Sequence, residues 1–508
     1  MTDAIVIGSG PNGLAAAIRL ARAGRSVIVL EAAEQPGGAV RSEALTLPGF
    51  RHDTFSSVYP AAAASPVFAS MPLSAHGLEW IHPAACMAHP LPEGEAAVLY
   101  RDLEATARSL DRQHPGDGRS WIDFAAPYLE AFPAVRATML GAFPPLGGAL
   151  ELLRDAGLRR SAGFARLLGG SAVGLAQRLF GGDGARAWLY GTAMHVDAPP
   201  EKPGSAIAAL YLNLLGHAVG WPSPRGGAQR LTDALVGYLL SLGAEVRTGA
   251  TVEQILSAGG QVRGVGISGG ETVTAPLVIA DVMPHALLRM TGEALSGWYR
   301  KALSRFAYGP ATVKVDWALD GPIPWLNHEV AGAGTVHVAG SEHELLRAAV
   351  QSAKGLAPRP FLLLGQQSIA DPSRAPAGRH TAWAYTHGPP SADWTSLTDA
   401  HVQAMEAQIE RFAPGFGEQI LARHVLAPAD LEARNANLIA GDVGGGSYAL
   451  RQAVFRPIPS PSPYRTPLAG LFLGSAAAFP GGAVHGVPGD AAAGAALRQS
   501  RRRPARSP

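Results

Sequence analysis

The segment that ends at Glu31 restricts the fold of this chain more than any other part of the sequence. An apolar run at residues 5–7 leads into the glycine-rich stretch GSGPNG at residues 8–13, and a second apolar run at residues 27–30 ends at Glu31. Between these runs, four apolar residues recur at helical spacing: Leu14, Ala17, Ile18 and Ala21. A strand, a glycine-rich turn, an amphipathic helix and a second strand in this order predict a dinucleotide-binding unit.

Each position of the turn has a physical role in such a unit. Gly8 permits the tight turn out of the strand, Gly10 lets the backbone approach a pyrophosphate, and Gly13 lets the helix pack closely against the sheet. The helix N-terminus presents its positive dipole end to the phosphates, and Glu31 is placed to accept hydrogen bonds from ribose hydroxyls. The segment predicts an ADP-containing cofactor bound by Gly8, Gly10, Pro11, Asn12, Gly13, Glu31 and Ala32.

Two further glycine-rich segments favour FAD over NAD. The pair at residues 37–38, followed by Arg41, forms either a second contact to the pyrophosphate or an ordinary turn beside a surface arginine. Residues 471–475 have the pattern of a buried strand and lead into a glycine-rich turn and an Ala-rich helix, a suitable place for phosphate, ribityl or the flavin pyrimidine edge. These segments add Gly37, Gly38, Arg41, Gly474, Ser475, Gly481, Gly482, Ala483 and Val484 to the predicted cofactor site, and Val252 is expected to pair with the adenine through its backbone.

Length, charge and cysteine content exclude several classes of protein. A chain of 508 residues exceeds the size at which one core keeps growing, so we expect two domains. The net charge of +2 gives no electrostatic case for binding nucleic acid. Cys86 is the only cysteine, which excludes a disulfide or CxxC pair within the chain. His82 and His89 flank it without an acidic cluster, and we expect no metal site.

The ends of the chain bear on its location. The first strand begins almost at Met1 and leaves no room for a signal or transit peptide, and no apolar run approaches the roughly 20 residues that span a bilayer. We expect a cytoplasmic protein, with peripheral contact to a membrane as an alternative. The abundance of Ala, Gly and Arg suggests a bacterial genome rich in GC. Residues 501–508 are expected to form a disordered basic tail.

Several motifs occur in the order typical of one enzyme family. They are the turn at residues 8–13, the 37–41 segment, PGFRHD at 48–53, PRGG at 224–227, DGPIPW at 320–325, NLIAGD at 437–442 and the turn at 480–489. Together they resemble the phytoene desaturase-like FAD-dependent oxidoreductases, and most closely the branch related to pyridine nucleotide-disulfide oxidoreductase domain-containing protein 2. Disulfide chemistry does not carry over, because a single cysteine forms no redox pair.

This resemblance implies an α/β fold in which a Rossmann-like FAD-binding domain of the amine oxidase/phytoene desaturase type is interleaved with an α+β substrate domain and a helical cap. The predicted FAD domain is built from residues 1–70, 222–290 and 455–500, and the substrate domain with its cap from residues 71–221 and 291–454. Residues 125–180 read as amphipathic helices. They form either a plain cap over the active site or a surface that faces a membrane.

The candidates for catalysis lie in two glycine-rich loops. His52 and Asp53 follow the first FAD segment, and His485 lies in the C-terminal turn, where histidine is able to donate to a flavin carbonyl or relay a proton. The alternative is that each side chain only binds backbone groups of its own turn. Tyr190, His195, Asp197 and His217 lie near the cap, where we expect ordinary core or surface histidines. Residues 311–317 alternate like a half-buried strand with Lys314 on its polar face.

Three functions remain open. The first is an FAD-dependent dehydrogenase (desaturase) or oxidase that passes a hydride from a largely apolar small molecule to flavin N5, with oxygen, a quinone or another external electron acceptor. The second is a flavin amine or amino-acid-type oxidase. The third is a non-catalytic lipid-binding escort protein of the same fold, which the retention of both cofactor loops argues against. We expect a monomer or a homodimer.

Overall fold

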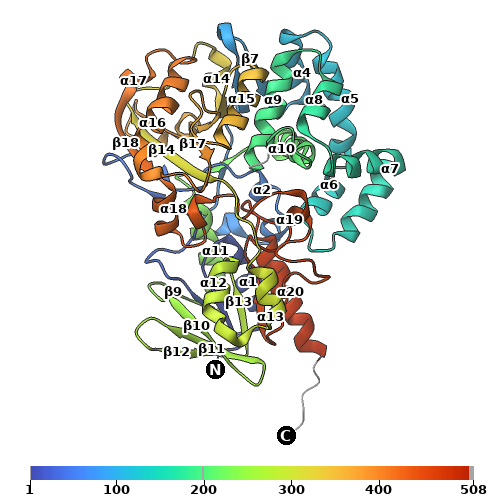
Figure 1. Cartoon of the computed structure of the whole chain (residues 1–508), viewed down its shortest axis with the longest axis vertical. Coiled ribbons are helices and arrows are strands. Elements are labelled where there is room, and N and C mark those ends of the chain that lie inside the picture. The colour runs from blue at the N-terminus through green and yellow to red at the C-terminus, as the bar shows by residue number, and fades with distance from the viewer. Residues whose placement is uncertain (1, 197–198, 503–508) are drawn as a thin grey trace.

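A parallel five-stranded sheet forms the base of the molecule, shown in the lower part of Figure 1. The computed structural model describes residues 2–196 and 199–502 of the chain. The sheet has the order β19-β13-β1-β2-β9, and its strands are β1 (Ala4–Ile7), β2 (Val27–Leu30), β9 (Glu245–Arg247), β13 (Leu277–Ala280) and β19 (Leu471–Leu473). All four strand pairings are parallel. The central strand β1 and its neighbour β2 are buried along their whole length, as expected for a parallel sheet covered on both faces.

Helices cover one face of this sheet, and a small antiparallel sheet lies beyond the other. The helices are α1 (Pro11–Arg22), α11 (Gln229–Ser241) and α20 (Val487–Arg502). The small sheet contains β10 (Val252–Ala258), β11 (Gln261–Ile267) and β12 (Thr272–Thr274), with α12 (Pro284–Thr291) and α13 (Gly297–Leu303) beside it. The predicted apolar face of α1 is confirmed, because Leu14, Ala17 and Ile18 are fully buried. The predicted disordered tail does not begin at residue 501, because α20 continues to Arg502, and residues 503–508 lie outside the described part of the chain.

A second, seven-stranded sheet lies above the first, at the upper left of Figure 1. Its order is β18-β14-β17-β16-β15-β6-β7, and only the β15–β6 pairing is parallel. The strands are β6 (Ala85–Pro90), β7 (Ala96–Leu99), β14 (Ala311–Leu319), β15 (Ala333–Val338), β16 (Leu362–Gly365), β17 (His380–Gly388) and β18 (Ile420–Leu426). The expectation of a half-buried strand at residues 311–317 was wrong. Every residue of β14 is buried, because both faces of the strand are covered: Val313, Val315 and Trp317 belong to a core shared with α16, and Lys314 on the other face contacts Asp53.

Helices fill the upper right of Figure 1. They are α4 (Leu103–Gln113), α5 (Asp117–Glu130), α6 (Phe132–Met139), α7 (Leu146–Leu168), α8 (Ala172–Leu179), α9 (Asp183–Ala193) and α10 (Ser205–Val219), which confirms the helices predicted within residues 125–180. Further helices are α15 (Glu342–Ser352), α16 (Trp394–Glu410), α18 (Pro428–Arg434) and α19 (Leu450–Val454). The parallel Rossmann-like sheet, the mixed sheet and the helical layer confirm the predicted fold class. The exact domain boundaries stay a prediction.

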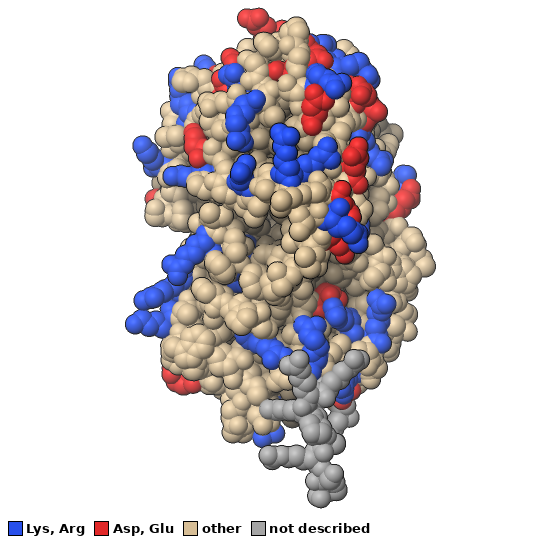
Figure 2. All heavy atoms as spheres, turned by 90° about the vertical axis from the view of Figure 1, so that its right-hand side faces the viewer, with Lys and Arg blue, Asp and Glu red and all other residues tan. Residues whose placement is uncertain are grey.

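The outer face of α7 exposes several leucines among charged side chains. Leu146, Leu150 and Leu158 are 64%, 67% and 76% exposed, and the helix is interrupted at Gly157, where φ is 76°. Figure 2 turns the right-hand side of Figure 1 toward the viewer and shows wide uncharged areas between scattered charges of both signs. No helix in the described part of the chain is long and apolar enough to cross a membrane.

Candidate functional site

A cavity of about 660 Å³ extends from the glycine-rich turn after β1 to the second sheet. Two sets of residues line it, and we call them the cofactor half and the substrate half. The predicted cofactor residues on its wall are Gly8, Gly10, Pro11, Asn12, Glu31, Ala32, Gly38, Arg41, Val252, Ser475, Gly482, Ala483 and Val484. The structure thus brings together segments from both ends of the chain and from its middle, as the sequence motifs predict.

The other four predicted cofactor residues lie behind this wall, where their small size permits close packing. A Cβ atom on Gly13 would lie 2.1 Å from the carbonyl oxygen of Gly8, so α1 approaches β1 as closely as the motif requires. Gly474 packs against Gly489, at the start of α20. Gly37 and Gly481 adopt φ angles of 127° and 116°, which favour glycine. These positions shape the turns rather than face the cavity.

Glu31 is fixed by three hydrogen bonds at the end of β2. Its Oε2 accepts from the backbone N of Ser9 at 2.8 Å and from the hydroxyl of Ser9 at 2.6 Å, and its Oε1 accepts from the backbone N of Ala33 at 2.9 Å. A carboxylate held in this way at the tip of the second strand is suited to accept hydrogen bonds from ribose hydroxyls.

Two buried polar atoms at the cofactor half fit FAD. Oδ1 of Asn12 and Nε of Arg41 have no hydrogen-bond partner among the described residues, although buried polar atoms are nearly always paired. Nη2 of Arg41 donates to the carbonyl oxygen of Arg434 at 3.2 Å, which holds the guanidinium at the cavity wall. An unpaired donor beside a glycine-rich helix N-terminus suits the diphosphate of such a cofactor, and an unpaired acceptor suits one of its hydroxyl groups.

The structure adds an acid that the sequence motifs did not assign to the site. Asp281 follows β13, and its Oδ2 accepts from the backbone N of Gly13 at 2.8 Å. Burial raises the pKa of this carboxyl to about 7, and the nearby Glu31 adds to the rise. The parallel order of β1 and β13 brings the two turns together. The position of Asp281 at the end of a predicted strand was the available signal, since ligands bind where parallel strands end.

The substrate half is lined mainly by aromatic and aliphatic side chains. They include Tyr59, Leu212, Trp221, Leu363, Trp383 and Tyr385. The polar side chains of this half include His195, Thr335 and Lys314. Among the described residues that line the cavity, the acidic residues are Glu31 and Asp281, and both lie at the glycine-rich turn. The substrate half is therefore an apolar chamber with few hydrogen-bonding groups.

Lys314 lies on the cavity wall, which corrects its expected place on a solvent-facing strand surface. The residue is 3% exposed, and its Nζ donates to the Asp53 carbonyl oxygen at 3.1 Å and to the Asp316 carboxylate. It also lies over the ring of Trp383, 5.9 Å from the ring centroid. Burial raises the pKa of Asp316 to about 6, although Lys314 opposes this rise. The lysine thus brings a compensated positive charge to the substrate half.

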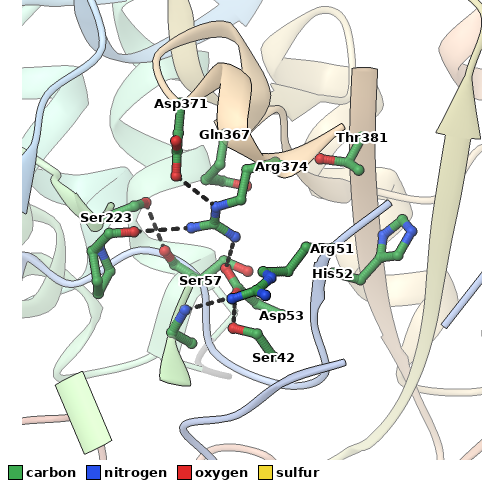
Figure 3. Close-up of polar contacts among 12 residues, drawn as sticks. Ser42, Arg51, His52, Asp53, Ser57, Ser223, Gln367, Asp371, Arg374 and Thr381 are labelled. Atoms are coloured by element: carbon green, nitrogen blue, oxygen red, sulfur yellow. Dashed lines mark hydrogen bonds and ion pairs between the residues drawn. The ribbon is translucent and has the colours of Figure 1, made fainter. Parts of the chain in front are cut away.

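The predicted catalytic pair His52 and Asp53 lies in β4 (His52–Asp53) and is not part of the cavity wall. Figure 3 shows Arg374 between two carboxylates: its Nη1 donates to Asp53 at 2.8 Å and its Nε to Asp371 at 2.9 Å. The other carboxylate oxygen of Asp53 accepts from Ser42 and from the backbone N of Ala228. Asp53 is therefore occupied by structural partners on both oxygens.

His52 is held between strands. Its Nε2 lies 2.7 Å from the hydroxyl of Thr46, and its Nδ1 lies 3.7 Å from Asp316. Burial, aided by the charge of Lys314, lowers the pKa of His52 to about 3, so the ring is neutral near pH 7. In this arrangement the imidazole supports the buried strand that carries Lys314.

His485 is bonded within its own turn. Its Nδ1 accepts from the backbone N of Val487 at 3.2 Å, which places the proton on Nε2, where it donates to the carbonyl oxygen of Gly482 at 3.1 Å. Burial lowers the pKa of this imidazole to about 4. The side chain is absent from the described cavity wall, whereas Gly482 is part of it. The histidine therefore shapes the turn that faces the cavity.

His195, which we expected to be an ordinary histidine, lines the substrate half. Its Nε2 lies 2.7 Å from Nε2 of His337, and burial lowers the pKa of His195 to about 3. Two facing nitrogens share one proton, so one ring donates and the other accepts. His217 instead accepts from the indole N–H of Trp121 within the helical layer. Asp197 lies outside the described residues.

Comparison with known proteins identifies the family of this chain. The family model for flavin-containing amine oxidoreductases matches residues 12–495. The chain is 28% identical to a rat protein called pyridine nucleotide-disulfide oxidoreductase domain-containing protein 2. The alignment covers 97% of this chain and 92% of the rat protein. A phytoene dehydrogenase of Streptomyces griseus is 26% identical over 85% of this chain and 83% of its own.

A solved structure shows the same fold. Wild-type putrescine oxidase bound to putrescine aligns with a TM-score of 0.60 and 18% identity, covering 99% of this chain and 98% of that one. The resemblance stated from the motifs is confirmed by the family match over nearly the whole chain, and this family implies FAD as the cofactor. The chain belongs to the flavin-containing amine oxidoreductase family and is an FAD-dependent oxidoreductase.

Proposed function

We propose that this protein dehydrogenates a largely apolar small molecule and passes the electrons to an external acceptor such as oxygen or a quinone. The observation that carries the proposal is the substrate half of the cavity, with its walls of Leu212, Trp221, Leu363 and Trp383 and no carboxylate among its described residues. FAD bound in the cofactor half supplies the hydride acceptor, flavin N5. The apolar wall orients the substrate and excludes water.

Two polar side chains act on the substrate in this proposal. Lys314 is held in place by the two bonds that its Nζ donates to the Asp316 carboxylate and to the Asp53 carbonyl oxygen. One donor of this ammonium is left to hold a water molecule or a substrate oxygen. His195, neutral and aligned by His337, offers a second hydrogen bond in the same chamber. His52, Asp53 and His485 act as positioning residues through the strands and turns that they hold.

The aromatic pair in the chamber disfavours an amine oxidase. Trp383 and Tyr385 are parallel to within 6°, with centroids 6.0 Å apart, and both project from the same strand. Stacked rings at this centroid separation are within the range of pairs in direct contact, which leaves no space between them for a substrate amine. A cationic amine would also meet Lys314 and find no acidic partner among the described residues of the substrate half. The relative named a phytoene dehydrogenase is consistent with an apolar substrate.

Anaerobic titration of the flavin-loaded protein tests the proposal. Terpene hydrocarbons such as limonene and phytoene are compared with putrescine and cyclohexylamine, and the long-wavelength flavin absorption band is followed. We expect bleaching by an apolar compound and none by the amines. Bleaching by the amines alone would establish the amine oxidase alternative. A protein that binds no FAD on reconstitution would instead support the lipid-binding escort alternative.

A further inference from the structure

The cofactor half contains a charge conflict at Asp281. Its Oδ2 accepts from the backbone N of Gly13, at the N-terminus of α1, and a Cβ atom on Gly10 would lie 2.9 Å from the same oxygen. Gly10 is the position at which the backbone of this unit approaches the pyrophosphate. A buried carboxylate thus lies against the turn that has to receive two negative phosphate charges.

Few groups near Asp281 are able to neutralise it. Glu31 is the charged neighbour that acts on it, and its negative charge favours the protonated form. Asn437 binds the backbone carbonyl of Asp281 rather than the carboxylate. Arg41 and Arg289 line the same cavity, but neither makes a hydrogen bond or ion pair with Asp281 among the described contacts. No acidic or basic side chain lies in the first turn of α1. From this helix, only the backbone dipoles stabilise the ionised form of Asp281.

The carboxyl group has room to act as a donor. Its Oδ1 has no hydrogen-bond partner among the described residues, and the side chain belongs to the cavity wall. In the protonated form this oxygen carries a hydrogen that donates toward an anion, whereas in the ionised form it repels one. Burial raises the pKa of the Asp281 carboxyl group to about 7, so the protonated and the ionised form are both populated near neutral pH.

We propose that Asp281 is a neutral carboxylic acid in the FAD complex, so that FAD binding takes up one proton from solvent and weakens as the pH rises above neutrality. This inference rests on the proposed use of FAD. The apoprotein loses the Asp281 proton as the pH rises. Because the diphosphate binds only when this proton is present, a higher pH weakens FAD binding. The dissociation constant for FAD then rises by up to about tenfold for each pH unit above about 7.

Titration of the apoprotein with FAD between about pH 6 and about pH 9, followed by quenching of flavin fluorescence, tests this linkage. The Asp281→Asn variant keeps an acceptor for Gly13 N and carries no charge. We expect its dissociation constant to be independent of pH and close to the wild-type value at low pH. The control is Asp233→Asn on α11, which makes the same change of charge at an exposed carboxylate 45% open to solvent. It should keep the wild-type pH dependence.

Calorimetry of the unaltered protein gives a second test that does not depend on a variant. The heat of FAD binding, measured at about pH 8 in buffers with different ionisation enthalpies, should show the uptake of nearly one proton. A flat pH profile with no proton uptake would overturn the inference, as would an Asp281→Asn protein that keeps the wild-type pH dependence. Failure to bind FAD at every pH would overturn the proposed cofactor itself, which separates the two failures.

Discussion

Replacement of Arg374 by methionine should destabilise the protein by about 3 kcal/mol, near the lower end of the range for breaking a buried ion pair. The guanidinium is 2% exposed and donates to Asp371, to Asp53 and, at 3.2 Å, to the carbonyl oxygen of Pro224. Hydrogen bonds to charged groups contribute about 1.5 to 3 kcal/mol each. Methionine retains part of the apolar packing but none of these bonds.

The remaining partners of the two carboxylates keep the loss below the sum of three such bonds. Asp53 still accepts from Ser42 and Ala228, and Asp371 still accepts from Ser373 and from the backbone N of Gly226. Neither acid is left without a donor after the substitution. The loss of stability therefore comes from two buried carboxylates whose negative charge is no longer compensated, and not from carboxylates without any hydrogen bond.

The measurement is urea unfolding followed by circular dichroism, with Arg119→Met as the control. Arg119 is 76% exposed and pairs with Asp123 on the surface of α5, so its loss should cost less than about 1 kcal/mol. Addition of Asp53→Asn to Arg374→Met should restore part of the stability, because it removes one unpaired charge. If Arg374→Met and Arg119→Met unfold at the same urea concentration, the assignment of a structural ion network at Asp53 is refuted.

Three further results are expected. Gly13→Ala should abolish FAD retention and lower the melting temperature, because its methyl group would collide with the Gly8 carbonyl oxygen; unchanged flavin content would contradict the packing argument. Lys314→Met should retain FAD but slow anaerobic flavin reduction by about tenfold or more in stopped flow, and an unaltered rate would exclude the lysine from the reaction. We also propose that the outer face of α7 contacts membranes. Wild-type protein should then float with anionic vesicles while the double variant Leu150→Glu, Leu158→Glu stays unbound, and a wild-type protein that does not float refutes the contact.

The cofactor half was predictable because its signals are local. Gly8, Gly10 and Gly13 each meet a steric requirement of one turn, and the apolar pattern predicts the strand before the turn and the helix after it. The C-terminal turn is likewise a glycine-rich segment between a predicted strand and a predicted helix. Asp281 was missed although it ends a predicted strand, because its meaning depends on β13 lying directly beside β1. Strand order is a tertiary property, and the pattern of a single strand does not contain it.

The substrate half was less predictable because its side chains take their roles from distant partners. The alternation of polar and apolar residues around Lys314 predicted a polar face on a half-buried strand, but the segment that carries Asp53 covers this face, and Asp316, two residues away, pairs with the lysine. Asp53 had the local environment expected of an active site. Its main partner, Arg374, is 321 residues away in the chain. No spacing rule connects two such positions.

The ion network and the proposed reaction site are physically coupled through Asp53. The side chain of Asp53 is held by Arg374, while its backbone carbonyl oxygen accepts from Nζ of Lys314. A shift of β4 after the loss of Arg374 therefore moves an acceptor of the cavity lysine. Arg374→Met should slow flavin reduction even under conditions where the protein stays folded, whereas Arg119→Met should not. Since Arg374 does not line the cavity, such an effect would be indirect, and the Asp53 carbonyl oxygen bound by Lys314 supplies one route for it.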